Sequence, residues 1–368
     1  MEAIAFWLVA LAVCAAPFVP ALREWLTRTD AAPLVVVREQ DTNIRHFAHS
    51  FFDQVQAYFE REGIDLLAPP PAYLGEFRPG QACRFLGGDH LPAWTDEERD
   101  RRLIQTLVLA TGDLILEGGF VFEQEIYCGG QLYAGAHSTF RAVYSGTDLL
   151  LGDDSTVARW LHSQGHVHIG RDCRVYGRVS SASSITIAAG TRFERINASL
   201  IRFASDAPVA GAPADAVDRR ATAVWRPPAT LHAIDPFTLL CDGDLVIDEG
   251  QQVERNLVVQ GKLTLASACR VVGNLKAATH IRIGAGNIVR GALVCPGPIT
   301  IGAGCVIKGP IVSETSIRVA AGSVIGAPGR PTSITAPRLI VEAGAQVSGT
   351  LWASDRGTVL ALPLEGKK

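Results

Sequence analysis

"LVIDEGQQVERNLVVQGK" (245–262) and "LTLASACRVVGNLKAATH" (263–280) follow one another directly and share one pattern of apolar and small residues. The next rows, "IRIGAGNIVRGALVCPGP" (281–298) and "ITIGAGCVIKGPIVSETS" (299–316), repeat the pattern at the same spacing of eighteen residues. Self-similarity at a fixed period is the signature of a solenoid, in which each repeat stacks on the one before. The second half of the chain is therefore predicted to consist of stacked turns.

The columns of this repeat indicate which side chains point inward. Aliphatic residues recur at the first, third, ninth and thirteenth positions, and small residues occupy the sixth and eleventh. Apolar alternation indicates strands, and small residues suit tight corners between them. Three such strand segments in each turn predict an all-β solenoid, a three-sided parallel β-helix. The clearest columns are Leu245, Leu263, Ile281, Ile299 and Ile317, with a sixth start at Leu339, and Val253, Val271, Val289, Ile307 and Ile325.

The first half carries the same pattern in a less regular form. "GDLIL" (112–116) and "GDLVI" (243–247) each open a series of turns. The period determines neither the handedness of the coil nor whether the two series form one continuous stack. Turn starts in the first series are expected at Leu114, Leu132, Leu149, Val167 and Ile185. We therefore divide the chain into a first β-helix block (106–204), an Ala/Pro-rich linker or excursion (205–238), a second block (239–356) and a tail (357–368).

The N-terminal region, 1–30, is predicted to hold a transmembrane anchor. Residues 3–22, "AIAFWLVALAVCAAPFVPAL", carry no charge, and about twenty residues of helix span a bilayer core of about 30 Å. A cleaved signal peptide would need positive charge before this run, where only Glu2 stands. Arginines follow the run, so the positive-inside rule places the body in the cytoplasm. The anchor residues are Ala3, Phe6, Trp7, Leu8, Leu11, Phe18 and Leu22.

A helical and loop module is expected over 31–105. An apolar stripe at helical spacing predicts a helix over 41–63, begun by Asp41 or Thr42 and ended by Gly63. A second short helix is expected over 95–103 with Thr95 as its cap. The first helix either packs on the domain behind it or docks on a membrane surface or partner. Its stripe comprises Ile44, Phe47, Phe51, Val55, Tyr58 and Phe59.

The chain shows few groups suited to catalysis or to cofactor binding. The net charge is −3, no Gly-Lys-Ser/Thr follows a glycine loop, and none of the eight cysteines lies in a C-x-x-C pair. We therefore expect no cofactor, metal, nucleotide or nucleic-acid partner. Five cysteines fall in inward columns and are expected to be buried free thiols: Cys128, Cys173, Cys269, Cys295 and Cys305. Candidate catalytic bases are His137, His162, His166, His168 and His280.

Residues 243–293, "GDLVIDEGQQVERNLVVQGKLTLASACRVVGNLKAATHIRIGAGNIVRGAL", resemble a bactofilin domain, from the polymer-forming bacterial cytoskeletal proteins. The resemblance covers 240–352 well and 109–203 more weakly. It implies a right-handed β-helix that polymerises end to end without nucleotide, associates with the inner (cytoplasmic) membrane and serves as a scaffold in envelope or polysaccharide synthesis. Typical members have a single β-helix between unstructured tails, whereas this chain has two blocks.

The ends of the blocks are where unpaired strand edges would support assembly. The function expected is a membrane-anchored scaffold that associates with itself or with envelope-synthesis proteins. Two alternatives remain open: a membrane-tethered acyltransferase of the hexapeptide-repeat type, and a non-polymerising binding subunit of a secretion or polysaccharide machine. A buried His–carboxylate pair in a cleft would favour the enzyme. The candidate assembly residues are Leu114, Leu116, Leu339, Val341, Leu351 and Trp352.

Overall fold

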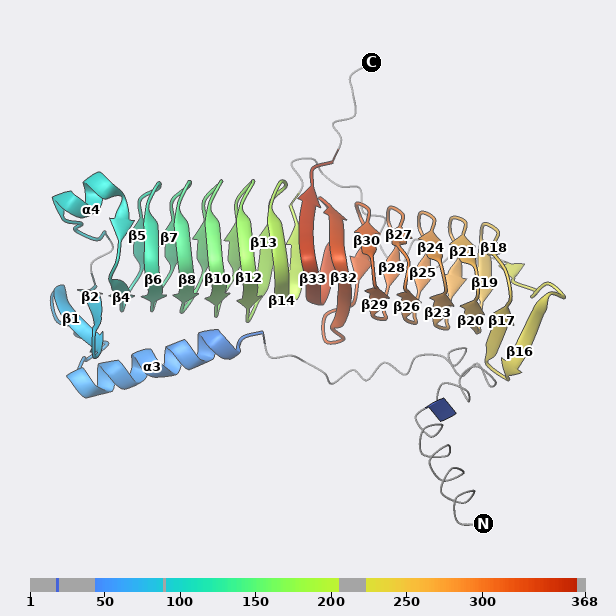
Figure 1. The fold of residues 1–368 in the computed structure, drawn as a ribbon, viewed down its shortest axis with the longest axis horizontal. Helices are drawn as coiled ribbons and strands as arrows, with labels where there is room; N and C mark the ends of the chain where they lie inside the picture. Colours follow the sequence, from blue (N-terminus) through green and yellow to red (C-terminus); the bar gives the residue numbers. More distant parts are fainter. Residues whose placement is uncertain (1–17, 20–43, 89–90, 205–222, 363–368) are drawn as a thin grey trace, which may run out of the picture.

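The computed structural model describes residues 18–19, 44–88, 91–204 and 223–362. It shows an all-β parallel solenoid of about 13 turns with few helices (Figure 1). With about 4.8 Å between neighbouring strands, such a stack is roughly 60 Å long. The solenoid fold predicted from the repeat is confirmed.

In the first block, the expected turn starts pair with one another in order. Leu114 pairs with Leu132, and Leu132 with Leu149, before the ladder continues through Val167 and Ile185. The strands are β3 (Leu103–Ile104), β4 (Leu107–Ala110), β5 (Leu114–Leu116), β6 (Val121–Cys128), β7 (Leu132–Ala134), β8 (Thr139–Ser145), β9 (Leu149–Leu151), β10 (Thr156–Ser163), β11 (Val167–Ile169), β12 (Arg174–Ser181), β13 (Ser184–Ile187) and β14 (Arg192–Phe203).

The second block shows the same agreement between column and register. Leu245 pairs with Leu263 and Leu263 with Ile281, and the ladder ends with Ile317 paired to Leu339. Its strands are β15 (Ala223–Val224), β16 (Leu231–Asp235), β17 (Thr238–Cys241), β18 (Leu245–Ile247), β19 (Gln251–Val253), β20 (Asn256–Val259), β21 (Lys262–Leu265), β22 (Arg270–Val271), β23 (Leu275–Ala277), β24 (His280–Ile283), β25 (Ile288–Val289), β26 (Leu293–Cys295), β27 (Ile299–Ile301), β28 (Val306–Ile307), β29 (Ile311–Ser313), β30 (Ser316–Val319), β31 (Val324–Ile325), β32 (Thr332–Glu342) and β33 (Gln346–Leu360).

Glycine at the eleventh position is required by the close approach of successive turns. A Cβ placed on Gly291 would collide with the carbonyl oxygen of Gly273, and one on Gly309 with that of Gly291. Backbone therefore stacks directly on backbone at this corner, and any side chain would separate the turns. The inward columns remain in register because these corners stay tight.

The two blocks meet at their C-terminal ends. β14 pairs with β33 in the antiparallel sense, so that Ile196 lies opposite Leu351 and Arg195 opposite Trp352. In Figure 1, β32 and β33 (red) lie between the green strands of the first block and the orange strands of the second. Buried residues of both blocks belong to one apolar core. The chain thus forms one continuous stack in which the two series of turns run towards each other.

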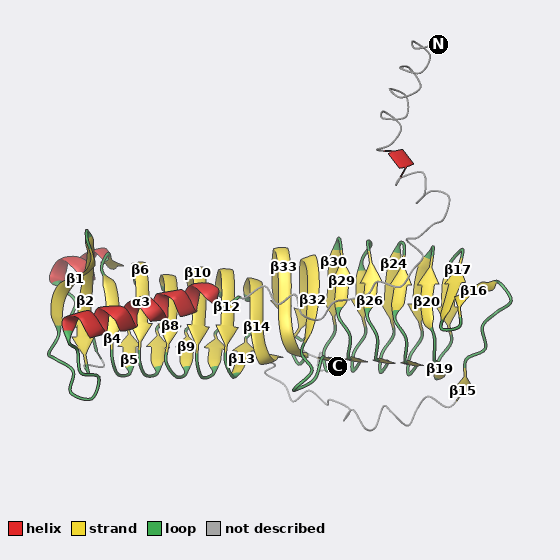
Figure 2. Ribbon diagram, turned by 90° about the horizontal axis from the view of Figure 1, so that it is seen from below, coloured by secondary structure: helices red, strands yellow, loops and turns green. Residues whose placement is uncertain are grey.

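Helix α3 (His46–Glu62) lies along one side of the first block (Figure 2). It ends at Gly63, whose φ of 64° gives the left-handed C-cap that the sequence predicted. Its start differs from the prediction, because Arg45, which makes no side-chain capping bond, occupies the N-cap position. Helix α4 (Asp96–Arg101) has the expected Thr95 cap, in a capping box with Glu98.

Each outer end of the rod is closed by a tryptophan and carries a hairpin. Trp94 packs against Phe120 and Phe122 of the first block, with ring centroids 6.1 and 6.0 Å away. Trp225 and Leu231 pack against the core at the second block. The hairpins are antiparallel: β1 (Tyr73–Arg78) with β2 (Gln81–Gly87), and β16 with β17.

The expected anchor, 3–22, lies outside the described residues except for Phe18 and Val19, which are 69% and 58% exposed. In the ranges that the structure describes, no helix combines the length and the apolar character needed to cross a bilayer.

Candidate functional site

A column of outward-facing residues, three of which carry rings, lies beneath α3. Leu109, Tyr127, Tyr144, His162 and Ser180 occupy paired positions on β4, β6, β8, β10 and β12. Tyr127 and Tyr144 stack with centroids 5.4 Å apart and ring planes 10° apart. An outward column on a solenoid normally meets water, yet these residues are buried. The face therefore needs a cover, and α3 provides it.

The helix meets this column with aromatic side chains of its own. The Phe52 ring stacks on Tyr144 at 5.3 Å, and Phe59 meets Tyr127 edge-on at 5.6 Å. Phe51 and Phe59 are buried, and burying such a ring contributes about 1.5–3 kcal/mol. The expectation that this helix packs on the domain behind it is confirmed.

His162 is the one candidate catalytic histidine that lies in this buried face. Its Nδ1 lies 2.7 Å from Ser180 Oγ, and its Nε2 has no hydrogen-bond partner within the described residues. Burial, reinforced by the charges of His49 and Arg45, lowers the pKa of His162 to about 4. The imidazole is therefore neutral near pH 7. Because α3 seals it from solvent, the Ser–His pair has no access to a substrate in this conformation.

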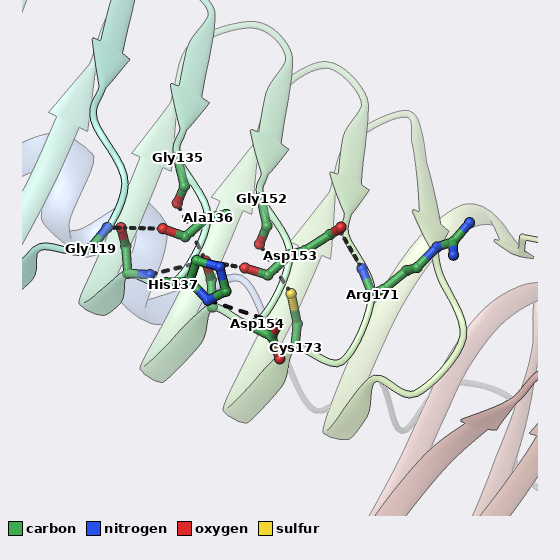
Figure 3. Close-up of polar contacts among 11 residues, drawn as sticks. Gly119, Gly135, Ala136, His137, Gly152, Asp153, Asp154, Arg171 and Cys173 are labelled. Carbon is green, nitrogen blue, oxygen red and sulfur yellow. Dashed lines mark hydrogen bonds and ion pairs between the residues drawn. The ribbon is translucent and has the colours of Figure 1, made fainter.

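His137 forms the one His–carboxylate contact in the first block (Figure 3). Its Nδ1 lies 3.8 Å from Asp154 Oδ2, and the two side chains are 72% and 55% exposed. Both residues occupy left-handed corner positions with φ of 59° and 53°. The backbone N–H of His137 donates to Asp153 O, and that of Asp154 to Arg171 O, each at 2.9 Å. These bonds repeat from turn to turn, so the pair sits at an open, solvated corner rather than in a cleft.

The other candidate histidines lie on the outer surface. His166 is exposed and its Nδ1 lies 2.8 Å from Ser184 Oγ. His168 is exposed, and His280 is half-buried with a pKa lowered mainly by burial. The backbone N–H of His166 donates to Asp148 Oδ1 at 2.7 Å. Within the described residues, none of the three imidazole rings forms an ion pair with a carboxylate.

The cysteines act as core residues. The seven described cysteines are free and buried, including the five expected in the inward columns. Burial raises the pKa of Cys128 to about 12 and those of Cys173 and Cys305 to about 11. Among the described residues, no group of three or more His, Cys, Asp or Glu side chains is arranged to hold a metal ion.

The candidate assembly residues divide between one outer end of the rod and the seam between the blocks. Leu114 and Leu116 are buried in β5, which among the described strands pairs only with β7 and is the first strand of its ladder. The four residues from the second block lie at the junction with β14, because the C-terminal end of that block is covered by the first block. Leu339, Val341 and Leu351 are buried, and half-buried Trp352 lies under the Arg195 guanidinium.

Free strand edges with exposed apolar side chains are also found on the hairpin strands β1 and β16. Within the described residues, β1 pairs only with β2, and β16 only with β17. Leu74 on β1 is 66% exposed, and Ile234 on β16 is 45% exposed, next to Phe237 at 72%. β16 falls inside the segment 205–238 that was predicted to be a linker or excursion, because "LHAID" lacks the column pattern of the repeat.

Comparison with models of known protein families, with curated proteins and with solved structures finds no match for this chain.

Proposed function

We propose that this protein is a bactofilin-like scaffold, anchored in the inner membrane with its body in the cytoplasm, that self-associates through the outer strands of its rod. The three sets of paired strands would form the three sides of the β-helix, with eighteen residues in each turn. The segment 3–22 would supply the anchor. The scaffold would recruit proteins of envelope or polysaccharide synthesis.

The observation that supports this proposal is the free edge at each end of the rod. A strand with one free edge presents backbone N–H and C=O groups that another chain can pair with. Exposed Leu74 and Ile234 lie on the two edge strands β1 and β16 and offer apolar side chains to a partner strand. Trp94 and partly buried Trp225 pack against the core in the outer turns of the two blocks. Association would therefore add strand to strand rather than join open cores.

The chain already joins solenoid ends in this way once. The antiparallel pairing of β14 with β33 connects the two blocks, with Ile196 and Leu351 buried at the seam. An antiparallel pair of β16 strands from two copies, centred between Ala233 and Ile234, would place His232 of each copy opposite Asp235 of the other. That register pairs a histidine of each copy with a carboxylate of the other across the new ladder.

Sedimentation velocity of the full-length protein in a mild detergent tests the proposal. The wild type should form larger species as its concentration rises. Leu74→Lys combined with Ile234→Lys should shift the midpoint of association at least tenfold, because a lysine on an edge strand opposes pairing. Tyr133→Lys, at a 47% exposed position on β7, which is paired on both sides, is the matched control and should leave association unchanged. A single species at all concentrations, or equal effects of the two changes, would contradict the proposal.

A further inference from the structure

A pocket beside the N-terminal end of α3 gathers three arginines. It is lined by Phe47 of α3, Arg159 and Trp160 of β10, Arg178 of β12, and Arg195 of β14. Trp160 pairs with Arg178, and Arg178 with Arg195, so these residues form one column across three successive turns. Neighbouring strands lie about 4.8 Å apart, so the backbone holds Arg178 and Arg195 at about that spacing.

Aromatic rings support the two central guanidinium groups. The Arg178 guanidinium lies 4.5 Å from the centroid of Phe47, and the Arg195 guanidinium 4.3 Å from the centroid of Trp352. Stacking on a ring face restrains a guanidinium while leaving the N–H groups along its edge free to donate. The supporting rings come from α3 and from the last strand of the second block. The pocket therefore exists only because α3 is docked and the two blocks are joined.

The positive charge of the pocket is only partly balanced. Arg159 lies 3.8 Å from Glu125, which also pairs with Arg141 at 3.1 Å. Glu194, the carboxylate in the pocket lining, accepts a hydrogen bond from the Gly177 N–H at 2.9 Å. Across the described ranges, neither Arg178 nor Arg195 forms an ion pair or donates a side-chain hydrogen bond, and the first turn of α3 holds no acidic residue.

The positive charges of Arg178 and Arg195 repel each other, and an anion bound between them would relieve this repulsion. Burial, and then the positive charge of Arg195, lower the pKa of Arg178. A bound oxyanion would offset the effect of the Arg195 charge, because it accepts hydrogen bonds from both guanidinium groups. A tetrahedral phosphoryl group has enough oxygens to accept hydrogen bonds from two guanidinium groups at once. A planar carboxylate, with two oxygens, bridges two such groups less well.

We propose that this pocket binds a phosphoryl group carried by a small ligand, held between Arg178 and Arg195. Trp160 and the half-exposed Tyr176 flank the site and offer apolar surface to the group that the phosphate esterifies. A soluble phosphate ester and the headgroup of an anionic lipid share this chemistry. The interaction adds a ligand-dependent contact at the point where α3, the first block and the second block meet.

Calorimetric titration of the full-length protein in a nonionic detergent, in a phosphate-free buffer, tests the proposal. The probes are inorganic phosphate and dihexanoyl phosphatidic acid below its micelle concentration. Arg178→Gln combined with Arg195→Gln should weaken binding at least tenfold. Arg174→Gln combined with Arg192→Gln is the control, because these residues lie on the same two strands, are exposed and pair with each other outside the pocket. The control should bind within twofold of the wild type.

The two probes distinguish the source of the phosphoryl group. Comparable binding of both probes, lost in the pocket variant, supports a soluble ligand. Binding of phosphatidic acid alone, lost in the same variant, supports a lipid headgroup. Absence of saturable binding by either probe, or equal losses in the pocket and control variants, would overturn the proposal. Thermal unfolding within a few degrees of the wild type shows that each variant remains folded.

Discussion

Asn197 and Thr350 lie 153 residues apart in the chain, yet Asn197 Nδ2 donates a hydrogen bond of 2.9 Å to Thr350 Oγ1. The bond crosses the seam between β14 and β33, where Ile196 and Leu351 are fully buried. The seam thus combines a strand ladder, apolar burial and a polar side-chain pair. These contacts make the two blocks one rod and direct their N-terminal hairpins to opposite outer ends.

The seam is expected to be sensitive to a single methyl group at Gly357. A Cβ at this position would collide with the ring of Phe193, which lies opposite it across the ladder. Gly357→Ala should therefore lower the free energy of unfolding by about 1–3 kcal/mol, as overpacking does. Urea denaturation measures the loss. Gly243→Ala, which meets no atom within 4 Å, is the control. Equal effects of the two substitutions would show that the Phe193 contact is not tight.

Asn287 is expected to be a polar support inside the second block. It is fully buried, accepts a hydrogen bond from Cys269 N at 2.7 Å and donates to the carbonyls of Ala266 and Gly284 at 2.9 and 2.7 Å. Asn287→Ala removes all three hydrogen bonds and leaves their backbone partners buried. It should lower the free energy of unfolding, measured by urea denaturation, by about 2–4 kcal/mol. Asn287→Cys should cost less, because Cys305 Sγ, one turn further on, contacts the Gly284 carbonyl from the same column. An equal cost for both variants would contradict this role.

The buried thiols should react slowly with thiol reagents in the folded protein. Burial disfavours the thiolate and raises the pKa of Cys128 to about 12, so little of the reactive form exists at pH 8. In a Cys14→Ser variant, which keeps only the seven described cysteines, an aromatic disulfide reagent should react at least 100-fold more slowly than after unfolding in urea. Rapid labelling of one thiol in the folded protein would contradict the buried assignment.

Docking of α3 should weaken as the pH falls. His162 has a pKa of about 4 in the folded state, against an ordinary value of 6.5. Below pH 6.5, His162 therefore binds a proton in the unfolded chain but not in the folded protein. The free energy of unfolding decreases between pH 6.5 and 4 for this reason. From pH 7 to 5.5 the loss due to His162 is about 1 kcal/mol. The groups that face the imidazole are Ser180, Tyr144, His49 and Arg45.

Urea denaturation at pH 7 and pH 5.5 measures this loss, with His162→Phe as the comparison. The variant keeps an aromatic ring in the column and should lack about 1 kcal/mol of the pH dependence of the wild type. His166→Phe, at an exposed position directly before the inward residue Val167, is the control and should retain the full dependence. Unchanged pH dependence in His162→Phe would show that this residue is not the titrating group.

The stacking register was predictable from sequence because each turn repeats the geometry of the last. Leu245, Leu263 and Ile281 form a visible column, and a column can only arise where identical positions meet. Thr95 and Gly63 were predictable for a similar reason, since capping depends on residues close to one another in the chain. These features follow from local chemistry or from periodicity.

The features that sequence could not provide depend on contacts between distant segments. Periodicity does not show which end of a block meets which, so Leu339 and Leu351 were assigned to an outer end. In the structure Leu351 pairs with Ile196 of β14, and Leu339 lies behind β33. His162 occupies an outward position, and only the docking of α3 buries it. Arg178 and Arg195 lie one turn apart, but their supporting rings come from Phe47 and Trp352.

Negative-stain electron microscopy of the full-length protein in detergent, over a range of concentrations and without nucleotide, tests the proposed scaffold most directly. Rods of roughly 60 Å, the length expected from about 4.8 Å per turn, should join end to end as the concentration rises. The joined species should disappear in the Leu74→Lys and Ile234→Lys double variant and persist in Tyr133→Lys. Single rods at every concentration, or rods that associate side by side, would contradict assembly through β1 and β16.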